Sequence, residues 1–447
     1  MSRVTAGSPV ATRTARSPSA SARAVLLAVL VAHLVVVDVL FLTAGTGKNT
    51  VLTVAKFVGL HAATVMMVQL VLVARLPWLD RRLGMDRLTL WHRVTGFALL
   101  WTVLTHATLV VLGYALLYAT PALPTFLSLA GVPASLFGIL AATVIVVIAA
   151  TSLRYARRRL RYEVWHALHL SLYLAVLLAL LHQGLESTTF ASSPWATAYW
   201  WTVWALVLGA LLTGRVVVPL WRNARHGFRV AAVVPEADDV VSVHVTGRDL
   251  HLLPARAGQF AIWRFPDHRG WWRANPFSLS AAPDGRSLRL TAKAVGDGSA
   301  GLRTLRVGSR AFVEGPYGAF TALQQVTGAT LLIAGGIGVT PVRALLEETT
   351  GPAVVLYRVP TPADAVLLPE LRALAARRGA TVHLLTGRTG PGNTPFAPPD
   401  LLALVPDIVH RDVYVCGPPA MTETVVRSAR ALGVPRAQIH AERFGLA

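Results

Sequence analysis

Six apolar stretches, each long enough to cross a lipid bilayer, dominate the first half of this 447-residue chain. A helix needs about 20 mostly apolar residues to span the hydrocarbon core, because it rises about 1.5 Å per residue across about 30 Å. Arginines cluster beside these stretches, which is typical of membrane proteins and argues against nucleic-acid binding despite a net charge of +20. We expect spanning helices at 24–44, 54–74, 94–117, 134–153, 164–183 and 199–219.

The charges between the apolar stretches predict how the chain is oriented. Arginine-rich segments precede the first stretch and follow the second, fourth and sixth, whereas the other connections hold few basic residues. The positive-inside rule then predicts a multi-pass protein of the cell membrane with both termini in the cytoplasm. The basic segment 1–23 is expected to be disordered, and 24–221 to form the six-helix domain. A single cysteine, Cys416, excludes a disulfide framework and a CxxC metal site.

Two of the predicted helices carry histidines at matched spacing. His92 and His106 lie 14 residues apart on one helix, and His169 and His182 lie 13 apart on another. Each spacing corresponds to about 20 Å along a helix axis. Ionisable residues inside a membrane are costly and usually functional. The pattern favours two haem irons, one held by His92 with His169 and one by His106 with His182. Interfacial, conformational or proton-relay histidines are the alternatives.

Helix geometry adds a condition to this pairing. Thirteen residues leave His182 well off the face of His169 on a straight helix, so the fifth span requires a bend or a π-bulge. Two further histidines, His33 and His61, lie in the first two spans. We expect both to be buried and hydrogen-bonded rather than to contact a porphyrin or a quinone, with Asp38 as a possible partner of one of them.

After Trp221 the composition becomes that of a soluble protein. Short β-rich runs separated by turns predict an antiparallel β-barrel over 226–325. Strands then alternate with helices, which predicts a parallel α/β nucleotide-binding domain over 326–447. The fold class is therefore a multi-domain membrane protein, with a six-helix transmembrane bundle followed by these two domains.

Glycine-rich turns in the last domain suggest where a phosphate binds. In AGGIGVTP (334–341) glycines follow an apolar strand and open a helix, whose N-terminus favours negative charge. CGPP (416–419) ends a later strand, so both loops should meet at the carboxyl edge of one sheet. Arg388 follows another strand and could hold a 2′-phosphate, although a solvated surface arginine is an equal alternative.

Several motifs occur in the order found in a known superfamily. Together they resemble the flavin and nicotinamide modules of the ferredoxin–NADP reductase superfamily. The four histidines and WHALHL (165–170) resemble the ferric reductase and NADPH oxidase transmembrane domain, so the similarity extends from about residue 24 to the C-terminus. The motifs of the soluble half are NPFSLS (275–280), KAVGDGS (293–299), VEGPYGAF (313–320), GGIGVTP (335–341), CGPPAM (416–421) and ERF (442–444).

This resemblance implies FAD, two b-type haems and NADPH or NADH as cofactors. It implies that Phe277 packs on the isoalloxazine, that Ser278 lies near flavin N5, and that Phe444 covers the flavin where nicotinamide enters; ordinary core packing is the alternative for both aromatic residues. Asn275 departs from the histidine usual at its position, and Ser299 is expected to cap the helix that follows. The implied flavin contacts are Arg273, Asn275, Pro276, Phe277, Ser278, Gly296, Asp297, Ser299 and Phe444, and the implied nucleotide contacts are Gly335, Gly336, Gly338, Thr340, Cys416, Gly417 and Pro418.

The function implied is electron transfer from cytosolic NAD(P)H through FAD and two haems to ferric iron or oxygen outside. The short outer loops favour a small-molecule acceptor over a docked protein. Val110 stands where superoxide-producing oxidases carry a further histidine, which argues against an ordered oxygen site. One alternative is a flavohaem reductase of a membrane quinone or partner protein. Another is a transport or scaffold protein with a degenerate reductase domain. The oligomeric state is left open.

Overall fold

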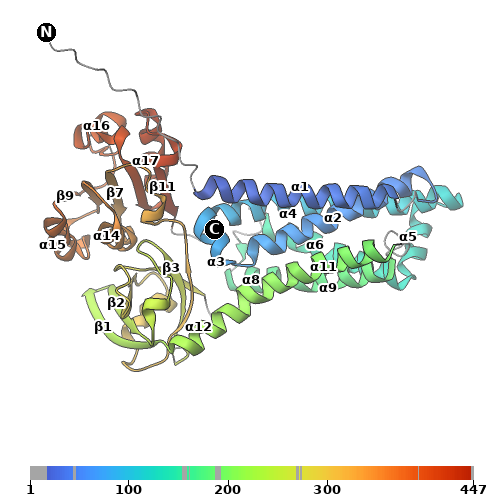
Figure 1. Cartoon of the computed structure of the whole chain (residues 1–447), viewed down its shortest axis with the longest axis horizontal. Helices are drawn as coiled ribbons and strands as arrows, with labels where there is room; N and C mark the ends of the chain where they lie inside the picture. Colours follow the sequence, from blue (N-terminus) through green and yellow to red (C-terminus); the bar gives the residue numbers. More distant parts are fainter. Residues whose placement is uncertain are drawn as a thin grey trace, which may run out of the picture. The chain divides into compact units, whose positions relative to one another are not determined.

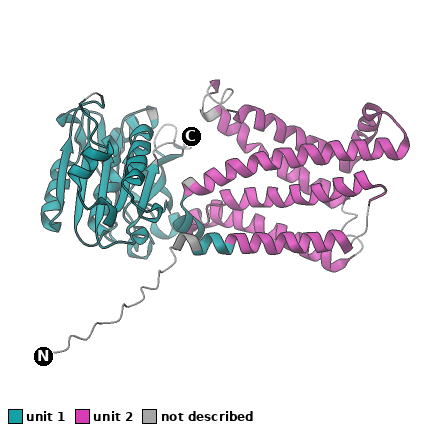
Figure 2. Ribbon diagram, turned by 90° about the horizontal axis from the view of Figure 1, so that it is seen from above, with its two compact units in different colours: residues 1–25, 78–84, 221–447 teal, residues 26–77, 85–220 magenta. Residues whose placement is uncertain are grey.

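The computed structural model describes residues 18–43, 47–153, 159–160, 162–186, 193–267, 271, 274–390 and 392–443 (Figure 1). The chain divides into two compact units (Figure 2). One, the membrane unit, contains 26–77 and 85–220. The other, the soluble unit, contains 1–25, 78–84 and 221–447.

The membrane unit is a bundle of helices that run side by side (Figure 1). Among the described residues, six helices are long and apolar enough to cross a membrane, which confirms the predicted number. Of the segment expected to be disordered, 1–17 lie outside the described residues, and the chain is helical from Pro18. The helices are α1 (Pro18–Thr43), α2 (Thr50–Val73), α4 (Met85–Tyr118), α5 (Ala122–Ala130), α6 (Pro133–Ser152), α8 (Tyr162–Leu170), α9 (Leu172–Glu186) and α11 (Pro194–Leu212). A π-helical turn (Thr213–Val217) continues α11 into α12 (Val218–His226), most of which belongs to the soluble unit.

Two buried tryptophans join the fifth and sixth spans. The indole nitrogens of Trp200 and Trp204 both donate to Gln183 Oε1, at 3.2 and 3.1 Å. Both side chains are 1% exposed and belong to an apolar core shared with α2, α6 and α9. A buried amide oxygen that accepts two bonds is well satisfied in a setting where water is absent.

The fifth span is interrupted between its two histidines, as the 13-residue spacing requires. Helix α8 ends at Leu170 and α9 begins at Leu172, leaving Ser171 as a turn residue between them. The Ser171 hydroxyl donates to the carbonyl oxygen of Leu168 at 2.7 Å. Such side-chain bonds compete with the backbone ladder and commonly bend helices.

The first half of the soluble unit consists of two three-stranded antiparallel sheets around one apolar core. An isolated bridge between Leu279 and Leu290 links the two sheets. These two antiparallel sheets occupy the region that the sequence predicted to be an antiparallel barrel. The strand orders are β1-β2-β5 and β4-β3-β6, with bounds β1 (Arg229–Ala237), β2 (Val240–Thr246), β3 (Phe260–Arg264), β4 (Asn275–Ser278), β5 (Ser287–Lys293) and β6 (Phe312–Tyr317).

The second half is a five-stranded parallel sheet in the order β11-β10-β7-β8-β9. The chain starts at the central strand β7, proceeds to one edge and then crosses to β10 on the other side. The carboxyl ends of β7 and β10 therefore form a topological switch point, where such sheets bind ligands. The elements are β7 (Thr330–Gly335), α14 (Val339–Glu348), β8 (Ala353–Arg358), α15 (Leu368–Arg378), β9 (Thr381–Leu385), α16 (Pro398–Leu404), β10 (Asp412–Gly417), α17 (Pro419–Ala431) and β11 (Ile439–Arg443); a short helix, α13 (Asp297–Ala300), precedes them.

A short helix between the second and third spans, α3 (Pro77–Leu83), belongs to the soluble unit through 78–84. Its Asp80 is 1% exposed and accepts a hydrogen bond from the backbone N–H of Gly318 at 2.7 Å. Leu79 and Leu83 are buried beside it. The sequence indicated no role for this segment beyond that of a basic connection between two spans.

Candidate functional site

The four histidines singled out in the sequence form two facing pairs. The rings of His92 and His169 have centroids 6.1 Å apart and an interplanar angle of 74°. Those of His106 and His182 are 6.3 Å apart at 64°. Helix α4 contributes one member of each pair, while α8 and α9 contribute the others. The pairing expected from their level along the helices is the one found.

These separations fit a metal ion held between two imidazoles. Two nitrogens on opposite sides of a metal, each about 2.0–2.1 Å away, put the ring centroids about 6 Å apart. In the described part of the chain, no three His, Cys, Asp or Glu side chains gather as a metal site. Each pair therefore offers two protein ligands, the number that a haem iron with two axial histidines requires.

The two pairs differ in what holds their rings. His106 Nδ1 lies 2.8 Å from the carbonyl oxygen of Ala55, and His182 Nδ1 lies 2.9 Å from that of Ala134. Because a carbonyl only accepts, both rings carry the proton on Nδ1 and leave Nε2 free for a metal. By contrast, Nδ1 of His92 and of His169 has no hydrogen-bond partner among the described residues.

The other two membrane histidines have hydrogen-bond partners, as expected, but both are half-buried rather than buried. His33 Nδ1 lies 2.8 Å from the Tyr199 hydroxyl, and its Nε2 lies 3.3 Å from the Thr64 hydroxyl. His61 Nδ1 donates to the carbonyl oxygen of Phe57 at 2.9 Å, and its Nε2 lies 3.4 Å from Asp38 Oδ1, close enough for an ion pair when the ring is protonated. Both of the His33 ring nitrogens are therefore engaged within the bundle.

The two predicted nucleotide loops meet at the switch point of the parallel sheet. Cys416 on β10 pairs with Ala334 on β7, immediately before the two glycine-rich turns. A Cβ built on Gly338 would lie 2.2 Å from the carbonyl oxygen of Cys416. Gly336 has φ +54, a left-handed conformation that favours glycine. The closeness of the loops thus depends on these glycines.

The other residues predicted to bind the nucleotide differ in their burial. The Thr340 hydroxyl is buried and donates to the carbonyl oxygen of Ile337 at 3.0 Å. Arg388 is exposed in the loop after β9. Sequence analysis missed Arg358, which ends β8 at the same sheet edge and donates to Thr386 O at 2.7 Å and to Asn393 Oδ1 at 3.2 Å. Burial lowers the pKa of Arg358.

The predicted flavin segment forms strand β4. Pro276 is exposed, Phe277 is half-buried against the barrel core, and Ser278 is buried. The Trp263 indole donates to Phe277 O at 3.2 Å, which anchors the strand from β3. A Cβ built on Gly298 would lie 3.0 Å from Asn275 Oδ1, so the 296–299 turn reaches this strand.

One prediction about this turn is wrong, and three residues cannot be assessed. Ser299 does not cap a following helix, because it lies inside α13. Its hydroxyl instead accepts from the N–H groups of Val295 and Gly296, at 3.0 and 3.2 Å. Arg273, Phe444 and the side chain of Asp297 lie outside the described residues.

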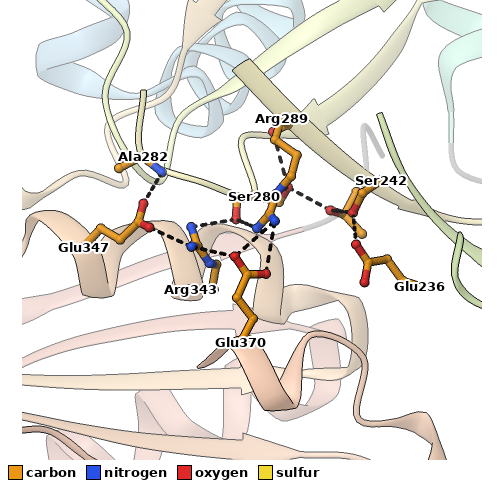
Figure 3. Close-up of polar contacts among 9 residues, drawn as sticks. Glu236, Ser242, Ser280, Ala282, Arg289, Arg343, Glu347 and Glu370 are labelled. Atoms are coloured by element: carbon orange, nitrogen blue, oxygen red, sulfur yellow. Dashed lines mark hydrogen bonds and ion pairs between the residues drawn. The ribbon is translucent and has the colours of Figure 1, made fainter. Parts of the chain in front are cut away.

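A cluster of charged side chains joins the flavin half to the nucleotide half, and we call it the Arg343 clamp (Figure 3). Arg343 Nη2 contacts Glu347 and Glu370, both at 2.7 Å, and Glu370 also accepts from Arg289 at 3.0 Å. Arg289 Nη2 donates to Ser280 O at 2.7 Å, two residues after β4. Glu347 Oε2 accepts from the N–H of Ala282 at 2.5 Å.

The clamp was not found from sequence. The i,i+4 spacing of Arg343 and Glu347 on one helix was the available signal. The partners Arg289 and Glu370 are distant in sequence, so no local pattern connects them.

Two family models and several curated proteins match parts of this chain. Residues 58–180 match the family described as ferric reductase like transmembrane component, and residues 332–427 match the oxidoreductase NAD-binding domain. The chain is similar to the ferredoxin–NAD(+) reductase component of an alkene monooxygenase system from Xanthobacter autotrophicus, with 30% identity over 49% of this chain and 70% of that protein. It is also similar to the reductase component of a naphthalene 1,2-dioxygenase system from Pseudomonas putida, with 28% identity over 48% of this chain and 74% of that protein. A solved ferredoxin reductase of carbazole 1,9a-dioxygenase matches 49% of this chain and 68% of its own at 25% identity, with a TM-score of 0.39.

Proposed function

The chain belongs to the membrane oxidoreductases that join a ferric reductase-like transmembrane domain to a ferredoxin–NAD(P) reductase-type module. From this premise we propose that it moves electrons from cytosolic NAD(P)H across the membrane to an acceptor outside. It is an NAD(P)H-dependent oxidoreductase embedded in a membrane through several spans. The identity of the carriers within the bundle and of the acceptor is the part that we propose.

The observation that carries the proposal is the pairing of the four histidines. His92 faces His169 and His106 faces His182, at ring separations that suit one axially ligated iron each. The Nδ1 bonds of His106 and His182 to backbone carbonyls leave both Nε2 atoms free for coordination. We therefore assign one b-type haem to each pair.

The soluble unit is assigned the first half of the reaction. The loops at the carboxyl ends of β7 and β10 would hold the nucleotide pyrophosphate, because their backbones approach closely and α14 presents its N-terminus there. Strand β4 would present Phe277 and Ser278 to the flavin. The Arg343 clamp holds the chain after β4 against α14, and so fixes one binding segment relative to the other.

We assign the second half of the reaction, electron transfer across the membrane, to the helix bundle. When bound, FAD would convert a hydride into single electrons and the two haems would carry them, chemistry that histidine and apolar side chains do not provide. The helices supply the histidine ligands, and their apolar surfaces exclude water and ions from the electron path between the two faces of the membrane. Positive-inside charges support an orientation with the soluble unit in the cytoplasm.

A small diffusible acceptor, ferric iron or oxygen, is the one that we propose. Val110 stands in place of the extra histidine of superoxide-producing relatives, which favours a ferric chelate as the first substrate to test.

An anaerobic absorption spectrum of the detergent-purified protein with added FAD, taken before and after NADPH, tests the proposal. We expect b-type haem bands that become reduced, with about two haems per chain by pyridine extraction. Bleaching of flavin in a preparation that holds no haem would contradict the assignment of the histidines.

A further inference from the structure

We propose that Gly59 and Gly138 are positioning residues for the His106–His182 pair, each keeping one backbone carbonyl accessible to a ligand ring. This inference rests on the proposed function, because it concerns how the ring is held for a metal. The accepting carbonyls belong to Ala55 and Ala134. In each helix the glycine follows the accepting residue by four positions, giving the pattern Ala-x-x-x-Gly in α2 and again in α6.

Helix geometry explains why position i+4 matters. The carbonyl of residue i already accepts from the N–H of residue i+4, and it has one lone pair left. Side chains in a helix lean toward its N-terminus, so the side chain at i+4 covers the surface around that lone pair. A glycine at i+4 leaves the lone pair open to a donor on a neighbouring helix.

The structure shows that the opening is filled by the histidine rings. A Cβ built on Gly59 would lie 2.7 Å from both Nδ1 and Cε1 of His106. One built on Gly138 would lie 3.0 Å from Nδ1 and 3.2 Å from Cε1 of His182. The distances at Gly59 are shorter than Cβ atoms adopt in proteins, and those at Gly138 are tighter than most Cβ contacts, so a methyl group would push the His106 ring off its carbonyl and shift the His182 ring to a smaller extent.

The same arrangement recurs on α4 with a different donor. Gln69 Nε2 donates to the carbonyl oxygen of His92 at 3.0 Å, and Gly96 follows His92 by four positions. A Cβ on Gly96 would lie 3.0 Å from that amide nitrogen. This third case supports the rule that a glycine at i+4 leaves the carbonyl of residue i open to a donor. Here, however, the donor is an amide at the end of a flexible side chain and is not a metal ligand.

Close helix packing is the competing explanation, because small-x-x-x-small patterns commonly line helix interfaces in membranes. Packing alone predicts that a methyl group changes stability without a specific effect on one haem. The positioning role predicts a change confined to the His106–His182 pair. That pair has both Nδ1 atoms bonded to carbonyls, which fixes the tautomer and the orientation of its rings, whereas Nδ1 of His92 and of His169 has no such partner among the described residues.

The test uses the full-length purified protein with the substitutions Gly59→Ala and Gly138→Ala. Gly209→Ala is the matched control, because Gly209 lies in α11 and nothing lies within 4 Å of its built Cβ. Haem content is measured by pyridine extraction, and midpoint potentials by redox titration. We expect each test variant to bind one haem about 10–100-fold more weakly, or to retain it at a higher potential, while the other haem and the control are unchanged.

The outcomes separate this inference from the proposed function. Absence of haem from the unaltered protein would contradict the function itself. Two haems with unaltered potentials in both variants would overturn the positioning role and leave the function standing, as would equal shifts of both haems. If a variant does not fold, the tautomers of His106 and His182 are measured instead, by ¹⁵N NMR of the unaltered apo-protein with labelled histidines. The Nδ1–H tautomer at His106 and His182 supports the inference, and the Nε2–H tautomer overturns it.

Discussion

Gly338 is a position where the nucleotide site leaves no room for a side chain. A Cβ there would lie 2.2 Å from the oxygen and 2.7 Å from the carbon of the Cys416 carbonyl, and backbone atoms cannot move aside cheaply. We expect Gly338→Ala to destabilise the chain by about 1–3 kcal/mol through overpacking and to raise the KM for NAD(P)H at least about tenfold. Thermal unfolding and the initial rate of flavin reduction measure the two effects.

Gly328→Ala is the control for this prediction, because nothing lies within 4 Å of the built Cβ at Gly328. That variant should behave as the unaltered protein does. A normal KM in Gly338→Ala would show that the two loops do not jointly bind the nucleotide.

Arg388 is the residue that we expect to discriminate between the two nicotinamide nucleotides. It is exposed after β9, whereas Arg358 at the same sheet edge already donates to Thr386 O and Asn393 Oδ1. A charge-assisted bond to a 2′-phosphate contributes about 1.5–3 kcal/mol, so Arg388→Ala should raise the KM for NADPH about tenfold or more. The KM for NADH should stay unchanged. Equal effects on both nucleotides, measured side by side, would remove Arg388 from this role.

At the scale of elements, the Arg343 clamp connects α14 and α15 to the segment after β4 (Figure 3). The Arg343 side chain is 6% exposed, and the side chains of Glu347 and Glu370 are 25% and 34% exposed. Removing one partner of a buried ion pair costs about 3–5 kcal/mol, and because the glutamates are partly exposed we expect a loss of about 3 kcal/mol in the free energy of unfolding. Arg343→Ala should therefore lower the melting temperature and slow flavin reduction by NAD(P)H.

Arg372→Ala provides the comparison for the clamp, because Arg372 is exposed on α15. It should change neither quantity. If Arg343→Ala melts normally but reduces flavin slowly, the clamp aligns the two halves without stabilising them. If neither the melting temperature nor the rate of flavin reduction changes, the clamp neither stabilises nor aligns the two halves.

Local properties of the sequence predicted most of the elements, and tertiary pairing accounts for what was missed. Hydrophobic length identified the six spans, and the 13-residue histidine spacing predicted an irregularity in the fifth. Neither indicated Ser171 as the residue where the helix breaks, because many residues tolerate a bend. The Asp80–Gly318 bond joins residues 238 positions apart, and no periodicity encodes such a contact. Ser299 was misread since a serine in a turn can bond backward as readily as forward.

At the scale of the whole molecule, the distribution of charge and one hydrogen bond bear on orientation. The connection between the second and third spans is basic, and through Asp80 it forms part of the soluble unit. The positive-inside rule places basic connections in the cytoplasm, so the soluble unit should lie there as well. The connection that contains α5, between the third and fourth spans, should then face the outside.

Cysteine labelling of intact cells tests this orientation directly. The chain's single cysteine, Cys416, is fully buried, so the unaltered protein should give little background. Leu123 on α5 is 69% exposed and Val307 in the soluble unit is 67% exposed, which makes both suitable for substitution by cysteine. We expect a membrane-impermeant maleimide to label Leu123→Cys in intact cells and Val307→Cys only after the membrane is opened. The reverse pattern would place NAD(P)H oxidation outside the cell, where the nucleotide is scarce, and would contradict the proposed direction of electron flow.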